Sequence, residues 1–362
     1  MSKFNKFVRN PGIFFRDYFI NKYPLSFDEQ GHNVVNENIL IMDDFRLYNI
    51  YENQCSEIID VVITWVNNND PNWIKKLKYY KAHSKNNLNR LSIDSSRFEN
   101  HGELYYVIKS IESHIPWVNS IFLVTDDQIP EFPLSDKVKI IDHKQIISHK
   151  YLPTFNSHVI EAHLHNIPGL SENFIYFNDD VFIARKLPKT HFLSGNNLSS
   201  LFLNRKNLDQ MIKKGVKTPT LLASLNCREL LLKKYNKKIS NPLVHAYVPL
   251  KKSYFKLAWL LFGNEINNFL PNRFRYDNDL NLATFLVPWM MYLGGKSKLS
   301  RDICYHFNIR SASSFSHYHM LNTRKNENIL PHSFCANDFI SNIQNSFDYK
   351  ANLMAFLKKF YS

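Results

Sequence analysis

Cysteine is scarce in this 362-residue chain, and its pattern excludes two kinds of small domain. The chain has four cysteines, and none of them forms a CxxC pair. Wide spacing without such pairs argues against a disulfide scaffold and against a zinc knuckle. We therefore expect reduced thiols in a cytoplasmic protein. The four positions are Cys55, Cys227, Cys304 and Cys335.

Long apolar runs are also missing. No stretch of about 18 apolar residues occurs, so we expect no membrane-spanning helix. The N-terminus lacks the uninterrupted apolar core of a signal peptide, and the chain has no internal repeat or low-complexity linker. These absences again predict a protein that stays in the cytoplasm.

The composition is that of a folded, basic protein. Hydrophobic residues make up 44% of the chain and aromatic residues 14%, which excludes a disordered protein. The net charge of +13 favours an anionic partner: nucleic acid, phospholipid headgroups, a nucleotide-sugar or an anionic polymer. Because no nucleic-acid-binding module is recognisable, we do not expect nucleic acid.

The first 25 residues alternate aromatic and basic side chains, unlike the rest of the chain. Aromatic rings enter the headgroup boundary of a bilayer while lysine and arginine meet anionic lipid, so this pattern suits a membrane surface. The alternative is that the aromatic residues pack on the catalytic domain or form an oligomer contact. We predict that residues 1–55 form a leader. In the first interpretation, this leader lies on the inner face of the plasma membrane as a peripheral segment.

Strands and helices alternate from residue 56 to about residue 200, which predicts a Rossmann-like α/β fold with a mostly parallel sheet and flanking helices. Apolar, β-branched runs predict strands at 58–66, 120–125, 137–141 and 174–177. Apolar stripes predict helices at 100–114, with Asn100 as N-cap and Glu103 completing a capping box, and at 156–167. We expect residues 201–345 to form a helical half with helices at 205–238, 253–263 and 279–293, and residues 346–362 to form a tail helix.

Acidic and amide side chains follow each predicted strand. They occur in Asn67–Asp70, at Asp126 and Asp127, at Asp142 and in Asn178–Asp180. Ligands of an open parallel sheet bind beyond the carboxyl ends of its strands. Clustered carboxylates repel one another unless a cation intervenes, and Mg²⁺ with substrate phosphates is the usual partner. The alternative for each single residue is a turn or a helix cap.

Two further groups of residues have functional potential. His158, Glu161 and His165 share one face of the predicted helix 156–167, and a solvated polar face is the alternative. Arg273 and Arg275 suit phosphate, because guanidinium donors match phosphate oxygens bidentately, although a surface salt-bridge cluster fits their spacing equally. His245 by itself is more typical of a structural histidine. These patterns indicate a phosphate-handling α/β enzyme and no more.

Several longer strings resemble the Stealth family. DVVITWVNNNDPNW (60–73) resembles its first conserved block, and residues 97–132 and 152–182 look like its long second block. His245 to Lys251 and RFRYDND (273–279) resemble the third block, and HSFCANDF (332–339) resembles the fourth. The blocks occur in family order and cover about a third of the chain.

The resemblance implies an enzyme that transfers a hexose- or N-acetylhexosamine-1-phosphate from a UDP-sugar. The acceptor would be a hydroxyl of a growing capsular or surface polysaccharide, and UMP would leave, with Mg²⁺ or Mn²⁺ as cofactor. Asn68, Asp127 and Tyr105 depart from the usual family residues, which leaves the sugar open. The implied catalytic residues are His245, Asp179, Asp180, Arg275 and Glu161. The implied substrate-binding residues are Asp60, Asn67, Asp70, Arg97, Asn100, Glu103, Asp126, His158 and Arg273, and the implied metal ligands are Asp179, Asp180 and Asp338.

Some alternatives stay open at this point. His245 is the favoured general base because imidazole titrates near working pH, but Asp179 or Asp180 could take that role. A metal-dependent glycosyltransferase that releases UDP is the nearest rival function. A non-catalytic polyanion-binding protein of a capsule-assembly complex is the second.

Overall fold

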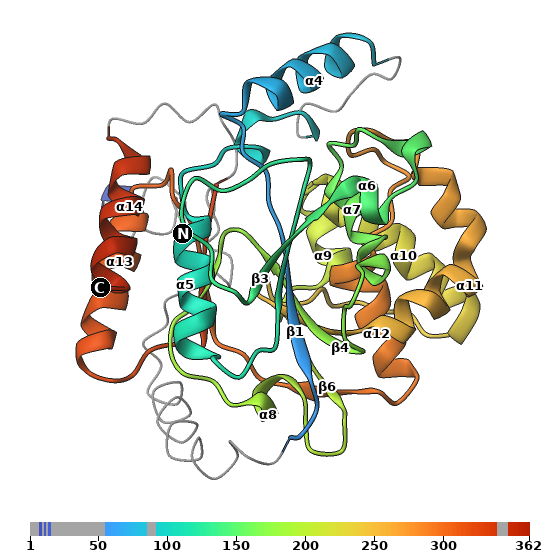
Figure 1. The fold of residues 1–362 in the computed structure, drawn as a ribbon. Helices are drawn as coiled ribbons and strands as arrows, with labels where there is room; N and C mark the ends of the chain where they lie inside the picture. Colours follow the sequence, from blue (N-terminus) through green and yellow to red (C-terminus); the bar gives the residue numbers. More distant parts are fainter. Residues whose placement is uncertain (1–6, 9–10, 12–13, 16–54, 85–91, 339–346) are drawn as a thin grey trace.

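A five-stranded sheet forms the centre of the protein (Figure 1). The computed structural model describes residues 7–8, 11, 14–15, 55–84, 92–338 and 347–362. The strand order is β3-β2-β1-β4-β7, in which only β7 runs antiparallel to its neighbour. The strands are β1 (Ile59–Thr64), β2 (Ile121–Thr125), β3 (Val138–Asp142), β4 (Asn173–Asn178) and β7 (Val248–Lys251). The first four are the strands that the sequence predicts, and their parallel pairing confirms the expected α/β class.

The pleat of the sheet explains why β1, β2 and β4 are mostly apolar and almost fully buried. Successive side chains of a strand point to opposite faces, and both faces are covered. In β1, Val61 and Ile63 pack with α5 (Leu104–His114) on one side, whereas Val62 packs on the other side with α11 (Lys252–Phe269) and α12 (Val287–Leu293). Because both faces are buried, a ligand of this sheet is expected at the strand ends.

The remaining elements complete the two outer layers (Figure 1). A three-stranded sheet pairs β5 (Val181–Ile183) with β10 (Ser333–Asn337) and β10 with β9 (Cys304–Asn308), and β6 (Ser199–Phe202) pairs with β8 (Ser297–Ser300). The other helices are α4 (Pro71–Ala82), α6 (His143–Ile146), α7 (Ser157–Glu161), α8 (Lys189–Phe192), α9 (Leu208–Lys213), α10 (Pro219–Tyr235), α13 (Ser314–Asn326) and α14 (Tyr349–Phe360). Short helical turns are 3₁₀ at Ser95–Arg97, His149–Tyr151 and Leu164–Asn166, and π at Leu282–Leu286.

Local structure departs from the sequence predictions at two helices. The first begins at Leu104, and Glu103 rather than Asn100 is its N-cap, without a side-chain capping bond. The Glu103 carboxylate instead accepts a hydrogen bond from the His101 backbone N–H at 2.5 Å, so the predicted capping box is wrong. The predicted helix 156–167 ends at Glu161, and a turn separates it from Leu164–Asn166.

The second half of the chain contains the predicted helices and also strands that were not predicted. Helices α9 and α10 fall within 205–238, α11 covers 253–263, and the π turn with α12 covers most of 279–293. Strands β6 to β10 all lie beyond residue 198, and several of their residues, such as Phe202, Tyr305 and Phe334, belong to the hydrophobic core. Short strands with mixed polarity carry little periodicity, which is why the sequence pattern did not reveal them. Helix α14 lies where the tail helix is expected.

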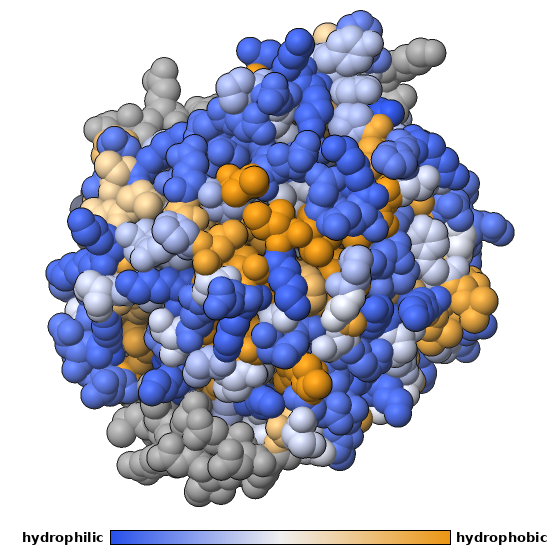
Figure 2. Space-filling model, viewed as in Figure 1, coloured by the Kyte–Doolittle hydropathy of each residue, from blue (hydrophilic) through white to orange (hydrophobic). Residues whose placement is uncertain are grey.

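The outer surface is mainly hydrophilic in the view of Figure 2, with apolar residues confined to a band across the upper middle and to small separate areas. Among the described residues, none of the helices combines the length and apolar character that crossing a bilayer requires. Most of the predicted leader, residues 1–55, lies outside the described residues.

Candidate active site

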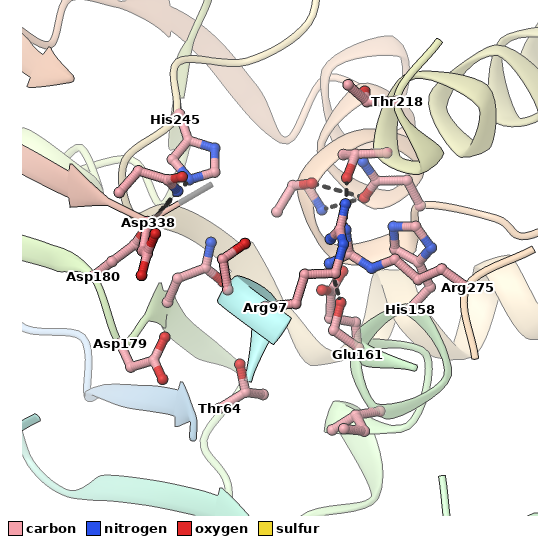
Figure 3. Close-up of a pocket in the computed structure, with 18 of the residues that line it drawn as sticks. Thr64, Arg97, His158, Glu161, Asp179, Asp180, Thr218, His245, Arg275 and Asp338 are labelled. Atoms are coloured by element: carbon pink, nitrogen blue, oxygen red, sulfur yellow. Dashed lines mark hydrogen bonds and ion pairs between the residues drawn. The ribbon is translucent and has the colours of Figure 1, made fainter. Parts of the chain in front are cut away.

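A pocket of about 670 Å³ opens at the carboxyl ends of β1 and β4. Figure 3 shows two groups of side chains that face this pocket from opposite ends. One group contains Asp179, Asp180 and His245, and we call it the acidic centre. The other contains Arg97, Arg275 and Glu161, and we call it the arginine centre. The pocket therefore brings predicted catalytic residues from both halves of the sequence together.

Asp180 lies in the turn between β4 and β5, where the central sheet passes into the three-stranded sheet. One carboxylate oxygen, Oδ2, accepts hydrogen bonds from Asn337 Nδ2 at 2.6 Å and from Cys335 Sγ at 3.3 Å, both from β10. The other oxygen, Oδ1, is buried and has no hydrogen-bond partner among the described residues. A buried carboxylate oxygen without a partner is costly, so Oδ1 is available to a ligand.

Asp179 and Glu103 add two more carboxylates to the acidic centre. Burial, reinforced by the neighbouring Asp180 charge, raises the pKa of Asp179 to about 7. Burial, reinforced by Asp179, also raises the pKa of Glu103 well above its ordinary value. Together with Asp180, these carboxyl groups form a donor set that a divalent cation would neutralise. The acidic centre therefore fits Mg²⁺ or Mn²⁺.

His245 faces Asp180 across the acidic centre. Its Nε2 lies 3.9 Å from Asp180 Oδ2, and 44% of its side chain is exposed. His245, His306 and Cys335 also place one potential ligand atom each within 4.8 Å of one another. Imidazole and thiol are softer ligands than carboxylate and suit transition metals such as Zn²⁺. Burial, with Asp180 nearby, raises the pKa of the Cys335 thiol, which keeps it protonated when no metal is bound.

Arg275 holds the opposite end of the pocket. Its guanidinium donates from Nη1 to Thr220 Oγ1 at 2.9 Å and from Nη2 to Ser157 Oγ at 2.6 Å. Burial lowers its pKa, while the nearby Glu161 counteracts that effect. Burial, with the neighbouring positive charge of Arg275, lowers the pKa of Arg97 to about 9. Two desolvated guanidinium groups side by side form a strong attractor for phosphate.

The three residues of the predicted helical face do not stay together. His158 is buried at the pocket wall, where its Nδ1 is 3.1 Å from Asp279 Oδ2. Glu161 also lines the pocket, and its Oε2 is buried without a hydrogen-bond partner among the described residues. His165 stacks on Phe255 away from the pocket, because the helix ends between Glu161 and His165.

Asp126 lines the pocket beside a buried histidine. Its Oδ2 accepts a hydrogen bond from Lys76 Nζ at 2.6 Å, so a cation of α4 already compensates its charge. His143, the first residue of α6, is 5% exposed, and its Nδ1 has no hydrogen-bond partner among the described residues. Burial lowers the pKa of His143 to about 4, so this imidazole is neutral at physiological pH.

Asp60 and Asp338 have structural roles that the resemblance did not imply. Asp60 lies near the beginning of β1, at the opposite end of the sheet from the pocket. Its carboxylate accepts hydrogen bonds from Asn119 Nδ2, Ser120 N and Ser171 N at 2.7 to 3.1 Å. Asp60 therefore does not line the donor pocket, because Asp60 and the pocket lie at opposite ends of β1.

Asp338 lines the pocket, but its two oxygens are already engaged. Oδ1 is 2.5 Å from Arg310 Nε, and Oδ2 is 2.9 Å from both Arg310 Nη2 and His101 Nε2. Burial raises the pKa of Asp338, but the hydrogen bonds from His101 and Arg310 outweigh burial and lower it. A carboxylate already bound to a guanidinium in this way is a poor metal ligand. The ion pair with Arg310 therefore argues against Asp338 as a metal ligand and leaves Asp179 and Asp180 as the expected ones.

Four more predicted substrate-binding residues support the pocket rather than line it. Asp70 is the N-cap of α4, with Oδ1 accepting from the Asn72 and Trp73 backbone N–H groups. Asn67 accepts a hydrogen bond from Asn100 Nδ2 at 3.2 Å, which ties the β1–α4 turn to the 97–103 segment. Arg273 donates to the Pro153 carbonyl and stacks over Tyr80. The side chains of Asn67, Asn100 and Arg273 therefore fix loops around the site.

Some residues of the site escaped sequence analysis. Asn337 and Cys335 fall inside the HSFCANDF string, which could have placed them near the site, but their contacts with Asp180 appear only in the folded chain. His306, Ser157 and Thr220 give no sequence signal, because a single polar residue is unremarkable until the fold brings it to the pocket.

Comparison with known proteins identifies the family. Residues 58–85 match Stealth protein conserved region 1, and residues 97–201 match conserved region 2. Over the full length of both chains, the protein is 51% identical to capsular polysaccharide phosphotransferase LcbA of Neisseria meningitidis and 50% identical to a capsular polysaccharide phosphotransferase of Haemophilus influenzae. A solved glycosyltransferase, GlyE of Streptococcus pneumoniae, is 14% identical with a TM-score of 0.33, covering 84% of this chain and 63% of that chain. The chain belongs to the Stealth family and, within it, to the capsular polysaccharide phosphotransferases, which are transferases.

Proposed function

We propose that this protein transfers a hexose- or N-acetylhexosamine-1-phosphate from a UDP-sugar to a hydroxyl of a growing capsular polysaccharide. The observation that carries the proposal is the pairing of an acidic centre and an arginine centre within one pocket. Full-length similarity to capsular polysaccharide phosphotransferases supports the reaction class. The donor and the released nucleotide are the parts that experiment must establish.

The arginine centre would hold the phosphates of the donor. Arg275 is fixed in orientation by Thr220 and Ser157, so it need not lose side-chain freedom when the donor binds. Its remaining N–H donors and those of Arg97 suit phosphate oxygens. Glu161, close to Arg275, limits the repulsion between the two guanidinium groups before the donor arrives.

The acidic centre would hold the cofactor, and Asp179 and Asp180 are the ligands we expect for Mg²⁺ or Mn²⁺. When bound, such an ion would neutralise charge on the phosphate oxygens and on the leaving nucleotide. Asn337 and Cys335 fix one oxygen of Asp180 and leave Oδ1 directed away from these partners. Asp180 is thereby oriented before the ion arrives.

The transfer step needs one base. The acceptor hydroxyl oxygen attacks the phosphorus that bears the sugar, a new P–O bond forms, and the bond to UMP breaks. The hydroxyl proton passes to Nε2 of His245, which is open to the pocket. Asp180 Oδ2 lies 3.9 Å from that nitrogen, so the imidazole is next to the carboxylates of the acidic centre, where the reacting phosphate would bind. Asp180 itself is the weaker candidate for the base, because Asn337 and Cys335 already donate to its Oδ2.

Analysis of the released nucleotide tests the reaction. The purified protein would be incubated with Mg²⁺, a panel of UDP-sugars and short saccharide acceptors, and the products read by mass. UMP together with a phosphodiester product supports the proposal, whereas UDP with a simple glycoside refutes it and establishes a glycosyltransferase. Absence of any turnover would favour the polyanion-binding alternative.

Replacement of His245 by alanine tests the base. We expect turnover to fall by about 10²- to 10⁴-fold, as is typical when a proton-transfer group is lost. Exposed His319 on α13 provides a matched histidine-to-alanine control. Wild-type turnover in His245→Ala would move the role of base to Asp179 or Asp180. The predicted attachment of residues 1–55 to a membrane surface stays a prediction.

A further inference from the structure

A row of lysines borders the arginine centre, and the mechanism above does not use it. Residues 206–218 comprise α9 and the loop that leads to α10, and we call them the lysine rim. Leu208, Met211 and Thr218 line the pocket, so the rim forms part of its mouth (Figure 3 labels Thr218). Its lysines are Lys206, Lys213, Lys214 and Lys217.

The positive charge of the rim is not cancelled locally. Lys213, Lys214 and Lys217 are exposed, and none of them forms an ion pair with an acidic residue in the described part of the chain. The single acid of the rim, Asp209, is bound by Arg228 at 2.6 Å and Lys238 at 3.0 Å. Two cations from α10 and the segment after it therefore compensate Asp209, which leaves Lys213, Lys214 and Lys217 with their full charge.

The rim is held in a defined conformation. The Val216 backbone N–H donates to the Met211 carbonyl at 3.1 Å, and Gly215 takes a left-handed conformation with φ of +79°. Thr218 then caps α10 by accepting a hydrogen bond from the Leu221 N–H at 3.2 Å. Lys214 and Lys217 are thus carried by a turn that is anchored at both ends.

We propose that the lysine rim is a binding subsite for the phosphodiester groups of the already elongated polysaccharide, which extends out of the pocket. The inference rests on the proposed function: each transfer leaves one phosphodiester, and hence one negative charge, on the acceptor chain. The half-buried Arg97 and Arg275 would serve the donor phosphates, whereas a polymer longer than the pocket would reach the exposed rim lysines. Lysine suits such a partner because it acts as a point charge on a flexible stem that follows successive phosphates.

The test compares long and short acceptors. Product chains made by the wild-type enzyme would be fractionated by length, and kcat/KM measured on long and on short fractions at low and at high salt. The triple variant Lys213→Gln, Lys214→Gln, Lys217→Gln should lower the long-to-short ratio of kcat/KM about tenfold at low salt. This is the expected product of three exposed charge pairs that each contribute about a factor of two to three. High salt should abolish the difference.

A matched control removes the same charge elsewhere. Lys298, Lys358 and Lys359 are exposed, lie on β8 and α14, and do not line the pocket. Their triple glutamine variant should keep the wild-type long-to-short ratio. An equal fall in both triple variants would show that net charge, and not the rim, attracts the polymer, and would overturn the proposal.

Other outcomes also decide against the rim as a polymer site. A rise in KM for the UDP-sugar with an unchanged long-to-short ratio would assign the lysines to the donor. Loss of binding to vesicles of anionic phospholipid, again with an unchanged ratio, would assign them to a membrane surface. Failure of the proposed function looks different, because the wild-type protein would then release no UMP with any acceptor.

Discussion

The buried, neutral His143 should make this protein less stable at acid pH, and replacing this one residue should remove that effect. Its side chain is almost fully buried against the Lys76–Asp126 pair, and burial lowers its pKa to about 4. In the unfolded chain the imidazole regains its ordinary pKa of 6.5. Between these two pH values the unfolded state binds a proton that the folded state does not bind. The free energy of unfolding therefore falls as the pH falls from 6.5 to about 4.

The size of the effect follows from the two pKa values. A difference of about 2.5 pH units, at about 1.4 kcal/mol per unit, gives roughly 3 kcal/mol of stability that is present above pH 6.5 and lost by pH 4. His143→Gln cannot take up the proton. We therefore expect the free-energy difference of unfolding between wild type and variant to shift by about 3 kcal/mol in favour of the variant across this window.

Urea unfolding at a series of pH values measures this shift directly. Any packing lost in His143→Gln changes the free energy of unfolding by the same amount at every pH, so only the slope reports the proton. Exposed His149 offers a matched His→Gln control whose curve should run parallel to that of the wild type. Parallel curves for His143→Gln and the wild type would show that the buried imidazole is not responsible.

Three further substitutions separate structure from catalysis. Asp60→Asn should lower the free energy of unfolding by about 2 kcal/mol, because an amide cannot accept all the hydrogen bonds of the buried carboxylate. The value of kcat/KM per folded molecule should stay unchanged. Urea unfolding measures the first effect and initial rates measure the second. Asp338→Asn should cost roughly 3 kcal/mol by leaving Arg310 without its anion, while calorimetry should find Mn²⁺ affinity as in the wild type. Arg275→Lys should lower kcat/KM for the donor by about 10- to 100-fold, since one ammonium cannot bond Thr220, Ser157 and a phosphate together; an unchanged value would place the donor phosphates elsewhere.

The two kinds of ligand atom at the acidic centre provide a way to identify the cofactor. The carboxylates of Asp179, Asp180 and Glu103 are hard ligands, whereas His245, His306 and Cys335 offer softer atoms within 4.8 Å of one another. Because both sets meet at Asp180, Mg²⁺ and Zn²⁺ would compete for that residue. The donor chemistry therefore leads us to expect support of turnover by Mg²⁺ or Mn²⁺ and inhibition by Zn²⁺.

Much of the central sheet was predictable from local sequence. The continuous apolar runs of β1, β2 and β4 reflect burial on both faces, and burial on both faces is a property of a parallel sheet covered by helices. The acids after these strands, above all Asp179 and Asp180, indicated where a site would lie, because the carboxyl ends of parallel strands share one edge.

Tertiary structure alone decided which polar residues reach that edge. Asp60 and Asp179 are both acids at an end of a predicted strand, but they lie at opposite ends of the sheet, so one is structural and the other lines the pocket. Asp338 resembles a metal ligand in sequence, and only the folded chain brings Arg310 and His101 to both its oxygens. The hydrogen-bond and ion-pair partners of a side chain are often residues distant in sequence, and the local sequence pattern carries no information about them.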